Sequence, residues 1–179
     1  VLRSKTFDNA TSCSSENSLV LVDAVRQPMI EALEARGAVL LNAAQKAALQ
    51  QLMWPDGKLS AAVTGQSARV IAERAGFEDI AARDPRILMV EEDGFGAAHP
   101  YSGEKLSPVL SLYRARDFAA AMAIVERIYA WQGAGHSVAG HVSDLTKRIG
   151  CDSLAAAATA QGRLEALVHA AGDYTAAKI

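Results

Sequence analysis

Cys13 is the residue of this sequence best suited to act as a nucleophile. It lies in a segment of small and polar residues, Ser4–Asn17, directly before an apolar run. Thr, Ser and Asn side chains, together with exposed backbone N–H groups, can stabilise a thiolate, which is the reactive form of cysteine. A free thiol has a pKa of about 8.5, so lowering that pKa by about one unit makes roughly ten times more thiolate at neutral pH. The alternative is a buried, inert cysteine, since free cysteines are among the most buried residues.

Two further segments carry groups that could take part in chemistry. Glu104 lies in the segment Gly103–Leu110, which ends in a run of apolar residues. His136 lies in a glycine-rich turn, residues 133–137. Taken singly, Glu104 is typical of a solvated loop carboxylate, and His136 could equally be a structural residue.

Together these three segments resemble the CoA-acylating branch of the aldehyde dehydrogenase superfamily. Residues 7–17, FDNATSCSSEN, look like the family segment that carries the catalytic thiol. Residues 104–121, EKLSPVLSLYRARDFAAA, are similar to its EKLSP segment with the following strand and helix, and GAGHS matches its next turn. The order and separations agree over about Lys5 to His141. The Asn- and Ser-rich flanks of Cys13 look most like those of enzymes that act on sulfoacetaldehyde.

The resemblance implies a mechanism and a role for two residues. Cys13 would attack an aldehyde, hydride would pass to NAD or NADP, and the resulting thioester would be transferred to coenzyme A. Glu104 matches the glutamate that hydrogen-bonds the hydroxyls of the nicotinamide ribose. His136 matches a turn and implies no catalytic role. The expected partners are a small aldehyde, CoA and further copies of the chain in a homo-oligomer.

The resemblance also implies a division of the chain. Residues 1–142 would be a portion of the catalytic, thiol-bearing domain, and residues 143–179 a helical tail of unclear origin. Members of the family are longer, so we expect the nucleotide-binding half to be absent from this chain. No GxGxxG-type loop opens a helix in the sequence. The pair Gly94 and Gly96 is too isolated to form that motif.

Apolar runs alternate with amphipathic stretches, which is typical of parallel strands joined by helices. Strands are predicted at Ser18–Val25, Ala38–Leu41, Arg86–Glu91, Pro108–Tyr113 and His136–Val142. Helices are predicted at 28–36, 43–54 after an Asn42 cap, 67–76 and 118–131 after an Asp117 cap. The apolar stripe of the last one is predicted to consist of Phe118, Met122, Val125 and Tyr129. The alanine-rich residues 152–179 predict one or two more. We therefore expect an α/β fold with a mainly parallel sheet flanked by helices, of the aldehyde dehydrogenase catalytic-domain type, with a helical C-terminal stretch.

Composition narrows the function classes. The chain has 179 residues, with 18 Lys and Arg against 20 Asp and Glu, a net charge of −2. This balance gives no electrostatic basis for binding nucleic acid or an acidic membrane. No apolar run approaches the roughly 20 residues of a membrane span, and the N-terminus lacks a signal-peptide pattern. Two cysteines do not make a disulfide framework, so a reducing, cytoplasmic location is expected.

Three alternatives remain open. A thiol hydrolase would pair Cys13 with a histidine base, and the spacing selects none of the candidates. These are His99, His136, His141 and His169. A metal site is disfavoured, since His136 and His141 fall on opposite faces of a predicted strand and Cys151 has no CxxC partner. The third alternative is an inactive catalytic-domain remnant, or an assembly or binding module, that lacks the cofactor half.

Overall fold

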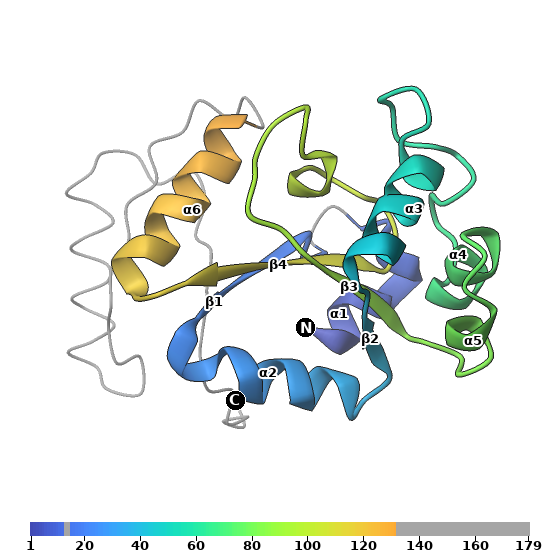
Figure 1. Cartoon of the computed structure of the whole chain (residues 1–179), viewed down its shortest axis with the longest axis horizontal. Helices are drawn as coiled ribbons and strands as arrows, with labels where there is room; N and C mark the ends of the chain where they lie inside the picture. The colour runs from blue at the N-terminus through green and yellow to red at the C-terminus, as the bar shows by residue number, and fades with distance from the viewer. Residues whose placement is uncertain (13–14, 132–179) are drawn as a thin grey trace. The chain divides into compact units, whose positions relative to one another are not determined.

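A parallel four-stranded sheet lies at the centre of the fold (Figure 1). The computed structural model describes residues 1–12 and 15–131. The strands are β1 (Ser18–Val22), β2 (Ala38–Leu40), β3 (Ile87–Glu91) and β4 (Val109–Ala115). Their order across the sheet is β1-β4-β3-β2, and each neighbouring pair is parallel. The prediction of an α/β fold with a mainly parallel sheet is confirmed.

Helices cover both faces of the sheet. They are α1 (Leu2–Thr6), α2 (Asp23–Glu34), α3 (Ala43–Met53), α4 (Ala68–Arg74), α5 (Glu78–Ala81) and α6 (Phe118–Trp131). Two short 3-10 turns, η1 (Phe7–Ala10) and η2 (Pro100–Ser102), lie in the connections. Figure 1 shows α2 on one side of the strands and α3 and α6 on the other. The arrangement has three layers, with the sheet buried between the helices.

The two faces of the sheet form two hydrophobic cores. Leu88 and Val90 of β3 pack with α3, α4 and α5, whereas Ile87 and Met89 of the same strand pack with α2. All four side chains are fully buried. Successive side chains of a strand point to opposite faces, so a strand covered on both sides must be apolar throughout. This explains why the run Ile87–Val90 is continuous rather than alternating.

Side-chain caps set the starts of three helices, and two of these caps, Asn42 and Asp117, were predicted. The Asn42 side chain accepts a hydrogen bond from the Gln45 N–H at 2.9 Å, and the Gln45 side chain accepts one from the Asn42 N–H at 3.0 Å. This is a capping box. Ser67 caps α4, and the Asp117 carboxylate accepts from the N–H of the third residue of α6. Such caps each contribute about 1 kcal/mol.

Two predictions about helices were wrong. The strand predicted as far as Val25 ends at Val22, and α2 begins at Asp23, so that Pro28 lies inside the helix. Asp23 forms an ion pair with Arg114 at 2.6 Å and is acidic in the first helical turn, which favours an early start. The apolar stripe of α6 was expected to include Phe118, but this side chain is 52% exposed.

Some predictions fall outside the described residues. These are the strand at 136–142, the boundary between residues 142 and 143, and the helices at 152–179. Among the helices of the described residues, none has the length and hydrophobicity needed to cross a membrane.

Candidate functional site

The topology brings two of the three predicted site segments together. The residues that flank Cys13 precede β1, and Glu104 precedes β4. Because β1 and β4 are adjacent and parallel, their preceding loops lie at the same edge of the sheet. Cys13 itself and His136 lie outside the described residues. The site is therefore built from the segments on either side of Cys13 and from the loop of Glu104.

Asn17 joins these two loops. Its side-chain oxygen accepts a hydrogen bond from the Lys105 N–H at 3.1 Å, and its backbone oxygen accepts one from the Ser111 N–H at 3.2 Å. Asn17 thus connects the end of the thiol segment, residues 4–17, to the residue after Glu104 and to β4. Asn17 is part of the quoted motif, but its chain position gave no indication of this contact.

Gly65 provides a second connection, through a third segment. The Asn9 side chain donates to the Gly65 carbonyl at 2.9 Å, and the Gly65 N–H donates to the Leu106 carbonyl at 2.9 Å. The thiol segment, the loop around Gly65 and the loop of Glu104 therefore form one hydrogen-bonded unit. Gly65 has φ +68°, a conformation that favours glycine.

Both site loops contain strained backbone. Asp8, Asn9 and Ala10 have φ of 48°, 49° and 60°, and Leu106 has φ of 41°. Asp and Asn tolerate the left-handed region, whereas Ala and Leu adopt it at a cost of roughly 1–2 kcal/mol. Such conformations persist only where surrounding contacts determine them, and they cluster at functional sites. Here the hydrogen bonds of Asn9 and Gly65 hold the two strained loops against each other.

Replacing Gly65 by alanine is expected to change the reactivity of Cys13. An alanine at φ +68° destabilises the fold by about 1 kcal/mol and disturbs the loop that Asn9 binds, four residues before Cys13. Gly57→Ala is the matched control, since Gly57 has φ +71° and open space around it. We expect both variants to melt at lower temperature. The rate at which iodoacetamide alkylates Cys13 is measured by peptide mass spectrometry, and only Gly65→Ala should change this rate several-fold. Equal alkylation rates in the two variants would contradict the coupling of these loops.

Glu104 and Lys105 are neighbours with opposite environments. Glu104 is exposed, whereas the Lys105 side chain is fully buried. The Lys105 ammonium donates to the carbonyls of Tyr101 at 2.7 Å and of Gly103 at 2.9 Å. Burial, with a smaller effect of the Lys5 charge, holds the pKa of Lys105 well below its usual range. The sequence reasoning missed Lys105, because its burial depends on contacts made only after folding.

Lys5 is a second buried lysine near this edge. Its side chain is 1% exposed, and burial lowers its pKa to about 8 despite the opposing effect of the Glu16 carboxylate. Burying a lysine is costly unless its charge is compensated. Two lysines are therefore buried at this edge, and burial disfavours the charged form of each.

Three buried hydroxyl groups at the same edge have no hydrogen-bond partner within the described residues. They belong to Ser15, Ser18 and Ser107. Ser15 lies two residues after Cys13, and Ser107 lies three after Glu104. Buried polar groups are nearly always satisfied in folded proteins. These hydroxyls are therefore candidates for contacts with a bound molecule or with polypeptide beyond the described residues.

The loop that carries Glu104 runs back along the length of the strands. Since β3 and β4 are parallel, residues 92–108 run from the carboxyl edge back to the amino edge. At its start, the buried Glu92 carboxylate lies 3.0 Å from the Lys46 ammonium and accepts from the N–H groups of Asp93 and Gly94, each at 3.0 Å. Burial raises the pKa of Glu92, but the hydrogen bonds from Gly94 and Lys46 outweigh it and leave the pKa lowered. Glu92 thus anchors the first residues of the loop.

Gly94 and His99 close the same anchor. The His99 Nδ1 lies 3.1 Å from Glu92 Oε1, and a Cβ on Gly94 would lie 2.1 Å from the His99 ring. Glu92, Asp93 and His99 could each offer a metal-ligand atom within 4.8 Å of the others. However, both Glu92 oxygens are already engaged by hydrogen-bond donors or by Lys46. We assign this cluster to loop anchoring rather than to metal binding.

Phe95 attaches the middle of the loop to the sheet. Its ring stacks on Tyr113 with centroids 5.4 Å apart, and the Arg127 guanidinium lies 4.1 Å from the centroid of the Phe95 ring. The Tyr113 hydroxyl donates to the Gly94 carbonyl at 2.9 Å. The isolated Gly94-Phe95-Gly96 segment therefore has a structural role, and it does not open a helix.

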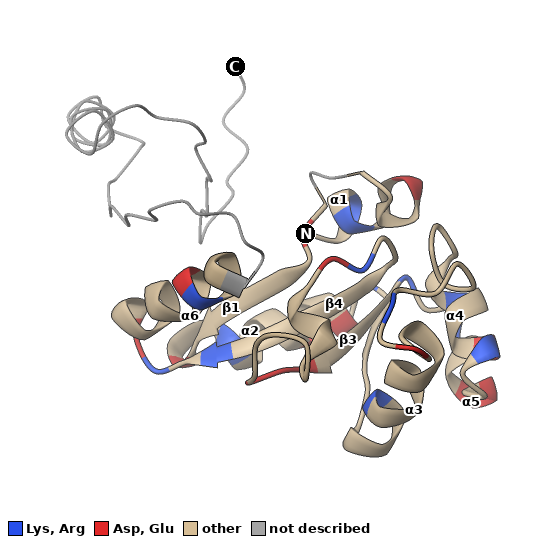
Figure 2. Cartoon of the chain, turned by 90° about the horizontal axis from the view of Figure 1, so that it is seen from above, with Lys and Arg blue, Asp and Glu red and all other residues tan. Residues whose placement is uncertain are grey.

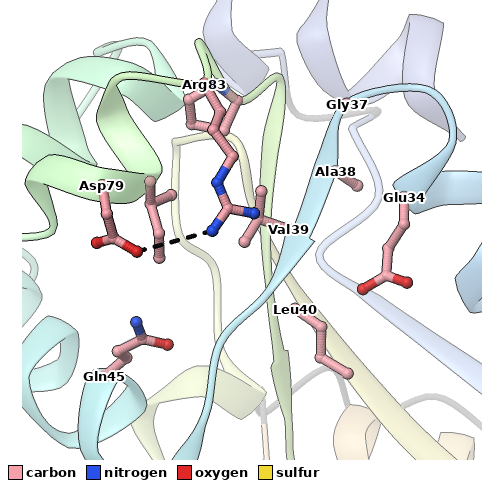
Figure 3. Close-up of a pocket in the computed structure, with 10 residues that line it drawn as sticks. Glu34, Gly37, Ala38, Val39, Leu40, Gln45, Asp79 and Arg83 are labelled. Carbon is pink, nitrogen blue, oxygen red and sulfur yellow. Dashed lines mark ion pairs between the residues drawn. The ribbon is translucent and has the colours of Figure 1, made fainter.

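A pocket of about 470 Å³ lies elsewhere, beside the outer edge of β2 (Figure 3). Val39 and Leu40 of the strand line one side, and Asp79 and Arg83, an ion pair at 3.7 Å, lie together on the side of α5. None of its lining residues belongs to the loops described above. Figure 2 shows basic and acidic residues interspersed over the described helices and loops. The site loops are thus distinguished by buried charge and strain rather than by a cavity.

Comparisons with known proteins show which enzymes this chain is similar to. No protein-family model matches the chain. Over 144 residues it is 64% identical to the acylating sulfoacetaldehyde dehydrogenase of Cupriavidus necator, a match that covers 80% of this chain and 29% of that protein. Over 137 residues it is 41% identical to the bifunctional aldehyde-alcohol dehydrogenase of Escherichia coli, covering 76% of this chain and 15% of that protein.

A solved structure supports the same relationship. The acetylating aldehyde dehydrogenase of Geobacillus thermoglucosidasius matches with a TM-score of 0.72 at 33% identity, covering 81% of this chain and 32% of that one. The chain thus spans less than a third of the length of each of these three proteins. The fold, the order of the motifs and these similarities together show that the chain belongs to the CoA-acylating aldehyde dehydrogenase family.

Proposed function

We propose that this chain is the thiol-bearing portion of an enzyme that oxidises a short aldehyde to an acyl-CoA, with NAD or NADP as hydride acceptor. The observation that carries the proposal is the joining of the thiol segment to the loop of Glu104 through Asn17 and Gly65. The 64% identity to an acylating sulfoacetaldehyde dehydrogenase supports sulfoacetaldehyde as the first substrate to test.

Cys13 is the proposed nucleophile. Its thiolate adds to the aldehyde carbon, and the oxyanion of the resulting thiohemiacetal is stabilised by backbone N–H donors, including that of Cys13. Loss of hydride leaves a thioester on Cys13, and NAD(P) supplies the acceptor when bound. The CoA thiol then attacks the thioester carbonyl and departs as acyl-CoA, which regenerates the Cys13 thiol.

Glu104 is the proposed contact to the cofactor. Its exposed carboxylate can accept hydrogen bonds from hydroxyl donors such as the two free hydroxyls of a ribose. In this role Glu104 orients the nicotinamide and moves no proton.

Two alternatives give different outcomes in one assay. A thiol hydrolase would release product without forming NADH. An inactive remnant or a binding module would release no product and form no NADH. His99, one of the four candidate bases, is engaged with Glu92, and the other three lie outside the described residues.

We further propose a cytoplasmic homo-oligomer whose partners are the aldehyde and CoA, with no nucleic acid or membrane partner.

The experiment that tests the proposal is NADH formation at 340 nm by the polypeptide at its native length. The aldehyde panel includes sulfoacetaldehyde, and each reaction is run with and without CoA. We expect NADH formation that depends on CoA after the first turnover. Folded protein that forms no NADH under either condition would overturn the proposal and favour the inactive alternative.

Glu104→Gln is expected to raise the KM for NAD about tenfold, with a smaller fall in kcat. Glutamine keeps the shape of the side chain but removes its charge. A hydrogen bond to a charged group contributes at least about 1.5 kcal/mol, which corresponds to roughly tenfold in affinity. Glu126→Gln, an exposed carboxylate on α6, is the matched control and should leave both constants unchanged. An unchanged response to NAD in Glu104→Gln would show that the loop does not contact the cofactor.

A further inference from the structure

Lys105 fixes the backbone on both sides of Glu104. Before Glu104, the carbonyl of Gly103 accepts a hydrogen bond from the Lys105 ammonium at 2.9 Å. After Glu104, the Lys105 N–H donates to the Asn17 side chain at 3.1 Å. The one residue between these two bonds is Glu104, whose side chain is exposed. The position from which its carboxylate emerges is therefore determined by Lys105.

The ammonium group of Lys105 also closes the loop onto the core. It donates to the Tyr101 carbonyl at 2.7 Å, and the same carbonyl accepts from the Ser111 hydroxyl of β4 at 2.7 Å. Tyr101 is fully buried, and its hydroxyl donates to the Lys46 carbonyl at 2.8 Å. The loop is thus connected to β4 and α3 immediately before Glu104.

A role in packing alone does not account for a lysine here. A fully buried ammonium is costly to desolvate, and apolar residues of similar volume often replace buried charges with no loss of stability. The cost is partly offset by the two hydrogen bonds that the Lys105 ammonium donates to the carbonyls of Tyr101 and Gly103. Burial lowers the pKa of Lys105, yet a neutral amine still has two N–H donors, one for each carbonyl. The loop geometry is therefore retained in either protonation state.

We propose that Lys105 is a positioning residue that holds the Glu104 carboxylate toward the nicotinamide cofactor. The proposal rests on the function proposed above and adds a residue to it. Lys105 touches neither the cofactor nor the reacting atoms in this role. It acts through Glu104, and that dependence can be measured.

The test is a double-mutant cycle on the polypeptide at its native length. Lys105→Met is made alone and in the Glu104→Gln background, and the KM for NAD, the kcat and the Kd for NADH are measured for all four proteins. Alone, Lys105→Met is expected to raise the KM and the Kd about tenfold while kcat falls less. In the Glu104→Gln background it should raise them less than about twofold, because the carboxylate it positions is already gone.

Two further variants keep the result interpretable. Asn17→Ala removes the other bond beside Glu104 and should show the same dependence on Glu104, even where Lys105→Met does not fold. Lys58→Met replaces an exposed lysine outside this loop, and its effect should be equal in both backgrounds. Equal effects of Lys105→Met and of Asn17→Ala in both backgrounds would overturn the positioning role. A wild-type protein that neither binds NADH nor forms it would instead overturn the proposed function.

Discussion

Replacing Cys13 by serine is expected to lower turnover at least about a thousandfold and to leave the melting temperature nearly unchanged. A serine hydroxyl is far less ionised than a thiol at neutral pH, and it forms an ester rather than a thioester. The residual reaction would come from binding and from the backbone donors alone. The measurement is NADH formation with CoA under saturating aldehyde.

The second cysteine supplies the control for this prediction. Cys151→Ser should keep wild-type turnover, because Cys151 lies outside the matched motif. Retention of more than a trace of activity in Cys13→Ser would refute the assignment of the nucleophile. Loss of activity in both variants to the same extent would show that the effect is not specific to Cys13.

Replacing Lys46 by methionine is expected to destabilise the protein by about 2–3 kcal/mol. The Lys46 ammonium lies 3.0 Å from the Glu92 carboxylate, whose side chain is 1% exposed. Removing one partner leaves a buried charge without compensation, which costs more than the pair itself contributes. Lys58→Met, in an exposed turn, is the matched control and should change the stability by less than about 0.5 kcal/mol.

The same variant has a predicted pH dependence. In the wild-type protein the pKa of Glu92 is lowered in the folded state, so its contribution to stability is present above the ordinary pKa of about 4.5. That contribution is lost as the pH falls through the folded value. Without Lys46 the folded pKa rises, so the destabilisation should be greatest at neutral pH and shrink in acid. A difference in melting temperature that stays constant from pH 7 to pH 4 would contradict this account.

The parts of the fold that follow from local sequence were predicted correctly. Asn42 and Asp117 cap helices in the structure as predicted, because a cap depends only on a few neighbouring residues. The boundary at Val22 was missed because an apolar run does not distinguish a buried strand from the helix that follows it. Phe118 was misplaced for a related reason, since spacing predicts a helical face but not which side chains the sheet covers.

The site was predictable only where a motif carried it. The motifs located Glu104 and the flanks of Cys13, and parallel pairing of β1 and β4 places them at one edge. Lys105, Asn17 and Gly65 could not be assigned roles, because the contacts by which they join the site loops connect residues 41 to 94 positions apart. Glu92 was not singled out from the sequence, because its buried ion pair is with Lys46 in a distant helix. Buried charge is a tertiary property with no local signature.

The central claim is that Cys13 carries an acyl thioester that CoA removes. The most direct test mixes the polypeptide at its native length with a short aldehyde and NAD in the absence of CoA. The reaction is quenched in acid, and the peptides containing Cys13 and Cys151 are identified by mass spectrometry. We predict an acyl group on Cys13 that disappears when CoA is added, with formation of acyl-CoA. NADH formation without acylation of Cys13, or an acyl group on Cys151 alone, would contradict the account.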